Sequence, residues 1–172
     1  MKELVGIAQQ VAAKLIARKE TIAVAESSAG GLIAASLLAV PGASAYFLGG
    51  AVVYTRDARR VLMDISDDGM KGLRSSSEPY AKLLAERMRT RFGSDWGLSE
   101  TGAAGPTGNR YGDAAGHSCM AVAGPAAEVM TLETGSNDRF ANMQTFAAAA
   151  MRLLLKNLTS ANARRASSGL PP

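Results

Sequence analysis

The sequence predicts an α/β fold, a three-layer α/β/α sandwich around a mixed, partly parallel sheet. Short apolar segments typical of buried strands alternate along the chain with amphipathic helical segments, which is the order of elements in this class. The 172 residues suit one domain with a continuous core. Hydrophobic residues make up 47% of the chain and charged residues 20%, as in folded globular proteins. Because only 5% of the residues are aromatic, alanine, aliphatic and methionine side chains must fill most of that core.

The start of the chain predicts a helix, a strand and a second helix. Residues 3–18 carry apolar side chains at the i, i+4, i+7 and i+8 spacing of an amphipathic helix. Residues 21–25, TIAVA, predict a short buried strand. A glycine-containing turn at 26–31 leads into an alanine-rich helix at 32–40, which a Pro-Gly pair ends.

A second strand is expected at about 47–54, followed by a short helix. Thr55 is the expected N-cap of that helix, because a threonine hydroxyl can accept a bond from a backbone N–H of the first turn. The stretch 64–76 has the composition of a loop, and Ser77 caps the next helix. The expected buried face of that helix comprises Ala81, Leu84, Ala85, Met88 and Phe92.

The second half predicts three strands, at 96–101, 118–123 and 128–133, and a long helix at 138–158. The apolar side of that helix comprises Phe140, Met143, Phe146, Ala147, Ala150 and Leu154. We therefore expect a single domain over 1–158. The remaining residues, 159–172, are rich in Ser, Ala, Gly and Pro, and we expect them to form a flexible tail.

Composition argues against several classes of protein. No apolar run approaches the roughly 18 to 20 residues that span a bilayer, and the first residues lack the order of a secretory signal, so we expect a cytoplasmic protein without a membrane partner. The one cysteine, Cys119, allows no internal disulfide. With a single histidine, His117, and carboxylates that show no ligand spacing, we expect no metal site and no cofactor.

The formal net charge of +4 suggests an anionic partner, but its distribution argues against nucleic acid. Arg164 and Arg165 lie in the expected tail, and without that pair the net charge is +2. Basic residues at 82–91 alternate with apolar ones at helical spacing, as on a solvated helix face. No nucleic-acid-binding motif is present, so we expect no nucleic-acid partner.

Two loops follow predicted strands, where ligands bind in open α/β sheets. The first, at 26–31, places Ser27, Ser28 and backbone N–H groups at a helix N-terminus suited to an oxyanion or a phosphate. Its structural alternative is N-capping by either serine, with glycines for close packing. The second, Gly102 to Gly108, contains neither the Walker A pattern nor the Rossmann fingerprint. So many Gly and Ala residues are entropically costly to order, which favours a binding role for this loop.

His117 and Cys119 lie at the start of a predicted strand. As the lone histidine, His117 could serve as a general base, although a histidine in this position is more often structural. Cys119 is expected to be buried and inert.

Four segments together resemble the C-terminal domain family of the competence/damage-inducible protein CinA, from about residue 4 to residue 155. They are TIAVAESSAGGLIAASLLAVPGASAYFLGGAVVYTRDARRVL, SSSEP, ETGAAGP and GSNDR. Stand-alone members of this family are nicotinamide-nucleotide amidases. The resemblance implies a metal-independent serine amidohydrolase that converts nicotinamide mononucleotide to nicotinic acid mononucleotide and ammonia, and we expect a homo-oligomer.

The family motifs map onto individual residues of this chain. The motif Ala-Glu-Ser-Cys-Thr-Gly-Gly falls on residues 25–31, so the resemblance implies Ser27 as nucleophile with Glu26 beside it. A second motif, Tyr-Ser-Asn-Glu-Ala-Lys, falls on residues 54–59, and Thr101 stands where the family has a serine. The residues expected to be catalytic are then Ser27, Glu26, Tyr54, Arg59 and Thr101. Those expected to bind substrate are Ser28, Gly30, Gly31, Gly102, Gly105, Thr107 and Arg110.

Arg59 is the main departure, because it replaces the lysine that would activate the serine. A guanidinium is not deprotonated in a protein, so Arg59 could bind phosphate or stabilise an oxyanion but could not act as the general base. Either Glu26 or His117 takes the proton, or the reaction has been lost. Three hypotheses follow: an amidohydrolase of pyridine nucleotides, a nucleotide-binding protein without turnover, and an amidase with another substrate.

Overall fold

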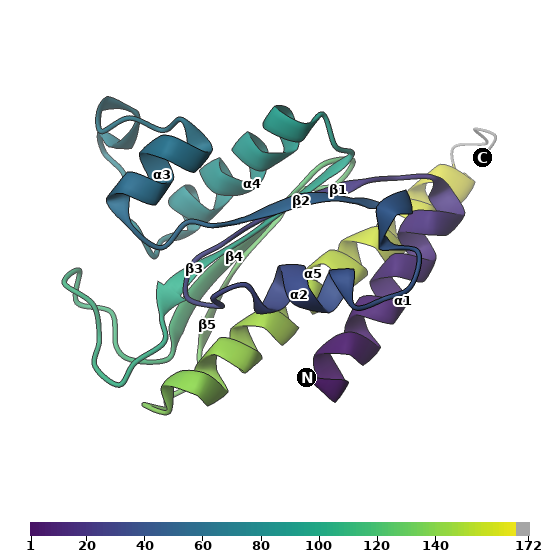
Figure 1. Cartoon of the computed structure of the whole chain (residues 1–172). Coiled ribbons are helices and arrows are strands. Elements are labelled where there is room, and N and C mark those ends of the chain that lie inside the picture. Colours follow the sequence, from purple (N-terminus) through teal and green to yellow (C-terminus); the bar gives the residue numbers. More distant parts are fainter. Residues whose placement is uncertain (168–172) are drawn as a thin grey trace.

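The computed structural model describes residues 1–167, with side chains described to residue 160. Five strands and five main helices form one body, with two short 3-10 turns (Figure 1). In chain order the elements are α1 (Lys2–Arg18), β1 (Ile22–Glu26), α2 (Leu32–Leu38), η1 (Ala43–Ala45), β2 (Phe47–Val52), α3 (Arg56–Met63), η2 (Asp68–Met70), α4 (Glu78–Phe92), β3 (Trp96–Ala103), β4 (His117–Ala123), β5 (Glu128–Glu133) and α5 (Arg139–Ser167).

The strands form one sheet in the order β2-β1-β3-β4-β5. β1 is parallel to both of its neighbours, β2 and β3, whereas β4 is antiparallel to β3 and β5 is antiparallel to β4. The expected mixed, partly parallel sheet is therefore confirmed. The first candidate loop, at 26–31, follows β1, which lies in the parallel part of the sheet.

Helices cover both faces of the sheet, which confirms the three layers (Figure 1). α1, α2 and α5 lie on one face, and α3 and α4 on the other. Alternate residues of β1 serve the two faces: Ile22 and Val24 belong to the core under α1, α2 and α5, while Ala23 and Ala25 pack with residues of α3 and α4. Such alternation follows from the opposite directions of successive side chains in a strand.

The close packing of α4 on the sheet depends on a glycine in β3. A Cβ atom placed on Gly97 would lie 2.0 Å from the Ala85 carbonyl oxygen of α4, a distance that no side chain could tolerate. Both expected helix caps are also confirmed. The Thr55 hydroxyl accepts a bond from Ala58 N at 3.0 Å, and the Ser77 hydroxyl accepts one from Tyr80 N at 3.4 Å.

Several expectations about element ends and burial were wrong. β2 ends at Val52 and α2 at Leu38, and the expected loop at 64–76 contains the η2 turn. Phe92 and Phe140, expected on buried helix faces, are 44% and 59% exposed. Phe92 is the last residue of α4, and its ring lies over Gly49 at the edge strand β2. Phe140 lies in the first turn of α5, which extends beyond the end of β3. Asn142, two residues further along α5, contacts the carbonyl oxygen of Ala104, the residue that follows β3.

The last helix is longer than its apolar pattern predicts. α5 continues to Ser167 and so includes the first part of the segment 159–172 that we expected to be a tail. Residues 168–172 of that segment lie outside the described residues. Within the part of the chain that is described, no helix is both long enough and apolar enough to cross a membrane.

Candidate functional site

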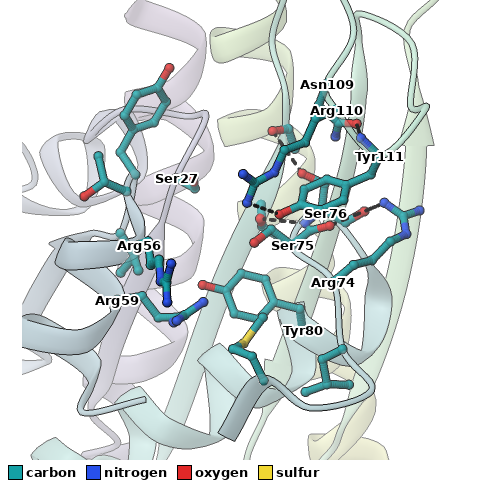
Figure 2. A pocket seen from close by; sticks show the side chains of 17 residues that line it. Ser27, Arg56, Arg59, Arg74, Ser75, Ser76, Tyr80, Asn109, Arg110 and Tyr111 are labelled. Atoms are coloured by element: carbon teal, nitrogen blue, oxygen red, sulfur yellow. Dashed lines mark hydrogen bonds between the residues drawn. The ribbon is translucent and has the colours of Figure 1, made fainter. Parts of the chain in front are cut away.

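A cavity of about 520 Å³ opens at the carboxyl ends of the parallel strands (Figure 2). Ser27 follows β1, residues 53–55 follow β2, and Thr101 and Gly102 lie near the end of β3. The chain leaves β1 through α2 on one face of the sheet and leaves β2 through α3 and α4 on the other. This change of face is the topological switch point at which open α/β sheets bind ligands.

Half of the expected site residues line this cavity, namely Ser27, Tyr54, Arg59, Thr101, Gly102 and Arg110. The other six are not among the described residues that line it: Glu26, Ser28, Gly30, Gly31, Gly105 and Thr107. Further residues that the sequence did not single out complete the wall. They are mainly arginine, serine and tyrosine residues: Arg56, Arg74, Ser75, Ser76, Tyr80 and Tyr111.

A buried carboxylate that the sequence did not predict supports the turn that carries Ser27. Glu100 of β3 has no exposed surface. Its Oε2 accepts bonds from the backbone N–H groups of Ser27 at 3.1 Å and Ala29 at 2.8 Å. Its Oε1 accepts bonds from the hydroxyls of Ser28 at 2.6 Å and Ser118 at 2.9 Å. An acidic residue inside a predicted buried strand is the sequence signal that could have revealed it, since carboxylates are rarely buried unless paired.

Glu26, expected to be catalytic, holds the N-terminus of α2. Its carboxylate accepts bonds from Ile33 N at 3.1 Å and Ala34 N at 3.0 Å, and a further one from Gly31. Burial raises the pKa of Glu26 and is only partly offset by these bonds. An anion at a helix N-terminus is stabilised by the unpaired N–H groups there. The position of Glu26 is that of a helix-capping group.

The backbone groups expected to stabilise an oxyanion already have partners in this arrangement. Gly30 N donates to the Ser27 carbonyl oxygen at 3.1 Å, and Gly31 N donates to Glu26. Both glycines have positive φ, 66° and 98°, so this tight turn favours glycine at both positions. Ser27 lines the cavity, and its hydroxyl has no hydrogen-bond partner among the side chains and backbone described.

Arg59 is buried and held by two acceptors. Its Nε donates to the Ile65 carbonyl oxygen at 3.2 Å, and an Nη donates to Asp67. Arg56 donates to the same carboxylate through Nε at 2.9 Å. Hydrogen bonding from Arg56, with the charge of both arginines, lowers the pKa of Asp67 to about 2, so this pairing persists at neutral pH. Arg59 is thus a fixed cation in the cavity wall.

The opposite wall carries two more arginines (Figure 2). Arg74 forms two bonds to Asp113, at 2.5 and 2.9 Å. Arg110 donates to the Tyr111 hydroxyl at 2.9 Å, and its guanidinium lies 5.0 Å from the centre of that ring. Among the described side chains, Arg110 forms no ion pair with a carboxylate. Because none of the described residues that line the cavity is a carboxylate, its electrostatic character favours an anion.

Tyr54 and Thr101 are fixed by neighbours from distant parts of the chain. The Tyr54 hydroxyl accepts a bond from Arg139 at 3.2 Å, and the other Nη of Arg139 donates to the Gly105 carbonyl oxygen at 2.6 Å. Arg139 ends the GSNDR segment, and sequence reasoning gave it no role. The Thr101 hydroxyl accepts a bond from Ser76 N at 3.3 Å.

The other residues of the second loop and the lone histidine lie away from Ser27. Gly105 adopts φ 109°, and a Cβ atom there would lie 2.9 Å from the Asn137 carbonyl oxygen, whereas Thr107 is exposed. His117 contacts Ser76 and Glu133 behind the cavity wall, so neither His117 nor Glu26 contacts the Ser27 hydroxyl. Cys119 is buried, as expected. In the described residues no group of three or more His, Cys, Asp or Glu side chains could hold a metal ion.

Solved structures and curated relatives resemble this chain. A competence-damaged protein (CinA) superfamily protein from Klebsiella pneumoniae superposes with a TM-score of 0.85 at 26% identity, covering 91% of this chain and 98% of that one. The competence/damage inducible protein CihA from Agrobacterium tumefaciens has the same fold, with a TM-score of 0.83 at 23% identity over 91% of this chain and 96% of that one.

Among curated proteins, a CinA-like protein of Gloeobacter violaceus is 41% identical over 119 residues, which cover 69% of this chain and 28% of the relative. A CinA-like protein of Desulforapulum autotrophicum is 33% identical over 158 residues, covering 91% of this chain and 37% of the relative. This chain spans well under half the length of these curated relatives. The family model of the CinA C-terminal domain matches residues 5–158, and the chain therefore belongs to that family.

Proposed function

We propose that this protein is a nicotinamide-nucleotide amidohydrolase that uses Ser27 as nucleophile. The observation that carries the proposal concerns the described residues: Ser27, whose hydroxyl has no hydrogen-bond partner among them, lines a cavity whose wall they supply with four arginines and no carboxylate. A mononucleotide offers both features that such a cavity needs in a ligand, a phosphate for the arginines and a carboxamide for the serine. Membership of the CinA C-terminal domain family supports the same substrate class.

Arg110 is the arginine best suited to the phosphate. Arg56, Arg59 and Arg74 are already paired with Asp67 or Asp113, whereas Arg110 has no carboxylate partner among the described side chains. A guanidinium can bind a phosphate through two parallel hydrogen bonds. With the phosphate at Arg110, the pyridine ring and its carboxamide extend across the cavity toward Ser27.

The reaction proceeds in two steps through a covalent ester. The Ser27 oxygen bonds to the carboxamide carbon, the C–N bond breaks, and ammonia leaves after taking up a proton. Water then cleaves the ester to give nicotinic acid mononucleotide and free Ser27. Arg59 cannot accept the serine proton, so water or hydroxide in the cavity takes it. Lack of a positioned base lowers the rate by on the order of 10² to 10⁴-fold, and we expect slow turnover that increases with pH.

Ammonia release from nicotinamide mononucleotide between pH 6 and 10 tests this proposal, with nicotinic acid mononucleotide measured in parallel. We expect slow release by the natural sequence, rising about tenfold per pH unit as the hydroxide concentration rises. Ser27→Ala should abolish release and leave binding of the nucleotide within a few-fold, because only the covalent step needs the hydroxyl. Equal release by both proteins would refute the role of Ser27.

A second candidate function is binding of a pyridine nucleotide without turnover. The observation that favours it is that neither Arg59, Glu26 nor His117 contacts the Ser27 hydroxyl. Under this alternative, nicotinamide mononucleotide binds at every pH tested and no ammonia appears. An amidase that prefers another carboxamide would instead show weak nucleotide binding and release ammonia from that other substrate.

We propose that the protein acts in the cytoplasm as a homo-oligomer and contributes to salvage of pyridine nucleotides. Light scattering during size-exclusion chromatography measures the oligomeric state directly, and a monomer would contradict that part.

A further inference from the structure

His117 occupies a buried position between three parts of the molecule. It begins β4, is 6% exposed, and lies against β5, the segment 74–77 and the loop that ends at Asp113. Its Nε2 lies 2.9 Å from the Ser76 carbonyl oxygen, and its Nδ1 is hydrogen-bonded to the Glu133 carboxylate. Both partners can only accept hydrogen bonds. A ring that satisfies both must therefore carry a proton on each nitrogen, which is the imidazolium form.

We propose that His117 is a positively charged positioning residue, which fixes the two segments that form the arginine-rich wall of the cavity. These segments are 74–77, which includes Arg74 and Ser76, and 109–113, which includes Arg110 and Tyr111. This role in ligand binding rests on the proposed function, whereas the charge of the ring does not.

The link from His117 to the cavity passes through Ser76. Ser76 has a left-handed backbone, φ 56°, a conformation that a serine adopts only when its surroundings require it. His117 and Arg74 both donate to its carbonyl oxygen, the Arg74 bond being 3.2 Å long. The opposite side of the residue faces the site: Ser76 N donates to the Thr101 hydroxyl at 3.3 Å, and the Ser76 hydroxyl donates to the Gly102 carbonyl oxygen at 3.2 Å.

A second link passes through Asp113. Its carboxylate lies 3.8 Å from His117 Nε2 and is the partner of Arg74. Asn109 also donates to this carboxylate at 2.8 Å, and Asn109 N donates to the Asp113 carbonyl oxygen at 3.0 Å. These bonds close the loop that presents Arg110 and Tyr111 to the cavity. The imidazolium therefore attracts the base of that loop as well as Ser76.

The charged groups around the ring favour its protonated form. Glu133 of β5 and Asp113 face it, and Arg74 is the opposing cation. From β4 itself, the Cys119 sulfur lies 3.5 Å from Nε2. Glu78 of α4 does not contact the ring directly; its carboxylate accepts a bond from the Thr131 hydroxyl of β5 at 2.7 Å. Burial by itself would lower the pKa of His117, but the bonds to Glu133 and Ser76 and the charge of Asp113 outweigh it and raise the pKa above its ordinary value.

Loss of the proton removes one of the two bonds, because a neutral ring has a single N–H. The bond to Glu133 then competes with the bond to Ser76. We expect the segments 74–77 and 109–113 to become less ordered as pH rises through the pKa of His117, and nucleotide binding to weaken in the same range. Loss of one charge-assisted hydrogen bond corresponds to about a tenfold change in Kd.

The charge of the ring can be measured directly, because this chain has one histidine and its imidazole NMR signal needs no assignment. We expect a titration midpoint above about 6.5. Glu133→Gln should lower that midpoint. Glu128→Gln, at the other end of β5 and paired with Lys156, should leave it unchanged. A ring already neutral at pH 6, or equal midpoints in all three proteins, would overturn the proposal.

Two further measurements separate the positioning role from the proposed function. In the ligand-free protein, the amide signals of Ser76 and Asp113 should titrate with the midpoint of His117, and His117→Asn should remove that step. Calorimetric titration with nicotinamide mononucleotide should give a higher Kd for His117→Asn than for the natural sequence at low pH. Above the titration midpoint of His117, the ratio of the two Kd values should fall toward one. Coupled amide signals without any nucleotide binding would refute only the proposed function. Nucleotide binding with amide signals independent of His117 would refute only the positioning role.

Discussion

The Glu100 carboxylate accepts a hydrogen bond from the backbone N–H of Ser27, so the proposed nucleophile is fixed from beneath by β3. The same carboxylate holds Ala29 N and the hydroxyls of Ser28 and Ser118. A charged group with no exposed surface is stable only when its acceptor sites are filled in this way. The geometry of the Ser27 turn therefore depends on one side chain of the neighbouring strand.

Glu100→Ala should strongly destabilise the protein. The substitution leaves the part-buried N–H of Ser27 and the buried N–H of Ala29 without an acceptor, and we expect the free energy of unfolding in urea to fall by about 3 kcal/mol. Glu86→Ala is a matched control, since Glu86 lies on the exposed face of α4, and it should change stability by about 0.5 kcal/mol or less. If the two variants lose the same stability, the Glu100 network contributes nothing specific.

Arg59→Lys should increase amidase activity, and more so when Asp67→Asn accompanies it. A buried lysine can lose its proton and accept that of Ser27, but a neighbouring Asp67 carboxylate would keep its ammonium charged. We expect the double variant to gain on the order of 10² to 10⁴-fold in kcat over the natural sequence, measured as ammonia release.

Arg60→Lys is the control for the single substitution, because Arg60 is exposed on the same helix and pairs with Asp57 at 4.0 Å. It should leave kcat unchanged. A higher KM with no gain in kcat in the Arg59 variants would mean that Arg59 binds substrate instead of occupying the position of a base.

Arg110→Ala should weaken binding of nicotinamide mononucleotide by about tenfold or more, the effect of losing one charge-assisted contact. Arg91→Ala, an exposed arginine of α4, removes the same charge from a surface outside the cavity. Calorimetric titration at low ionic strength compares the two. Equal losses would show that net charge, and no specific contact, determines binding.

Cys119 should react slowly with thiol reagents in the folded protein. Its side chain is buried, and burial raises the pKa of the thiol, so little reactive thiolate is present at pH 8. We expect Ellman's reagent to label the native protein at least about 10³-fold more slowly than the protein in urea, because labelling requires opening. Rapid labelling of the folded protein would show that α4 separates readily from the sheet.

Stability should depend on pH through His117. Its pKa is higher in the folded than in the unfolded chain, so its contribution is complete below about 6.5 and is lost as pH rises through the folded pKa. Urea unfolding of the natural sequence should show this decline as pH rises above about 6.5, and His117→Asn should show less of it. Parallel pH profiles for the two proteins would contradict a raised pKa.

The fold could be predicted from the sequence because its signals are local. Apolar spacing at 3–18 and the TIAVA run indicate one helix and one strand whatever the rest of the chain does, and Thr55 and Ser77 cap helices through bonds within a single turn. Burial at element ends was harder to predict, since it depends on where the sheet stops. Phe92 and Phe140 continue the apolar pattern of their helices past that limit.

The candidate site was predicted only in part because its bonds join distant residues. Ser27 and Glu100 are 73 positions apart, and Tyr54 and Arg139 are 85 apart. No local pattern indicates such pairs. The same holds for Asp67, which decides that Arg59 is a fixed cation and yet lies in a segment whose composition indicates only a loop.

Asp67 makes anion binding at Arg56 and Arg59 an exchange of one anion for another. A phosphate that approached these arginines would have to displace a carboxylate that the protein already supplies, so its measured affinity would be the difference between two ion pairs. Such an exchange releases few small ions from the protein surface. The salt dependence of nucleotide binding should then correspond to about one arginine, Arg110, and not to the four that line the cavity.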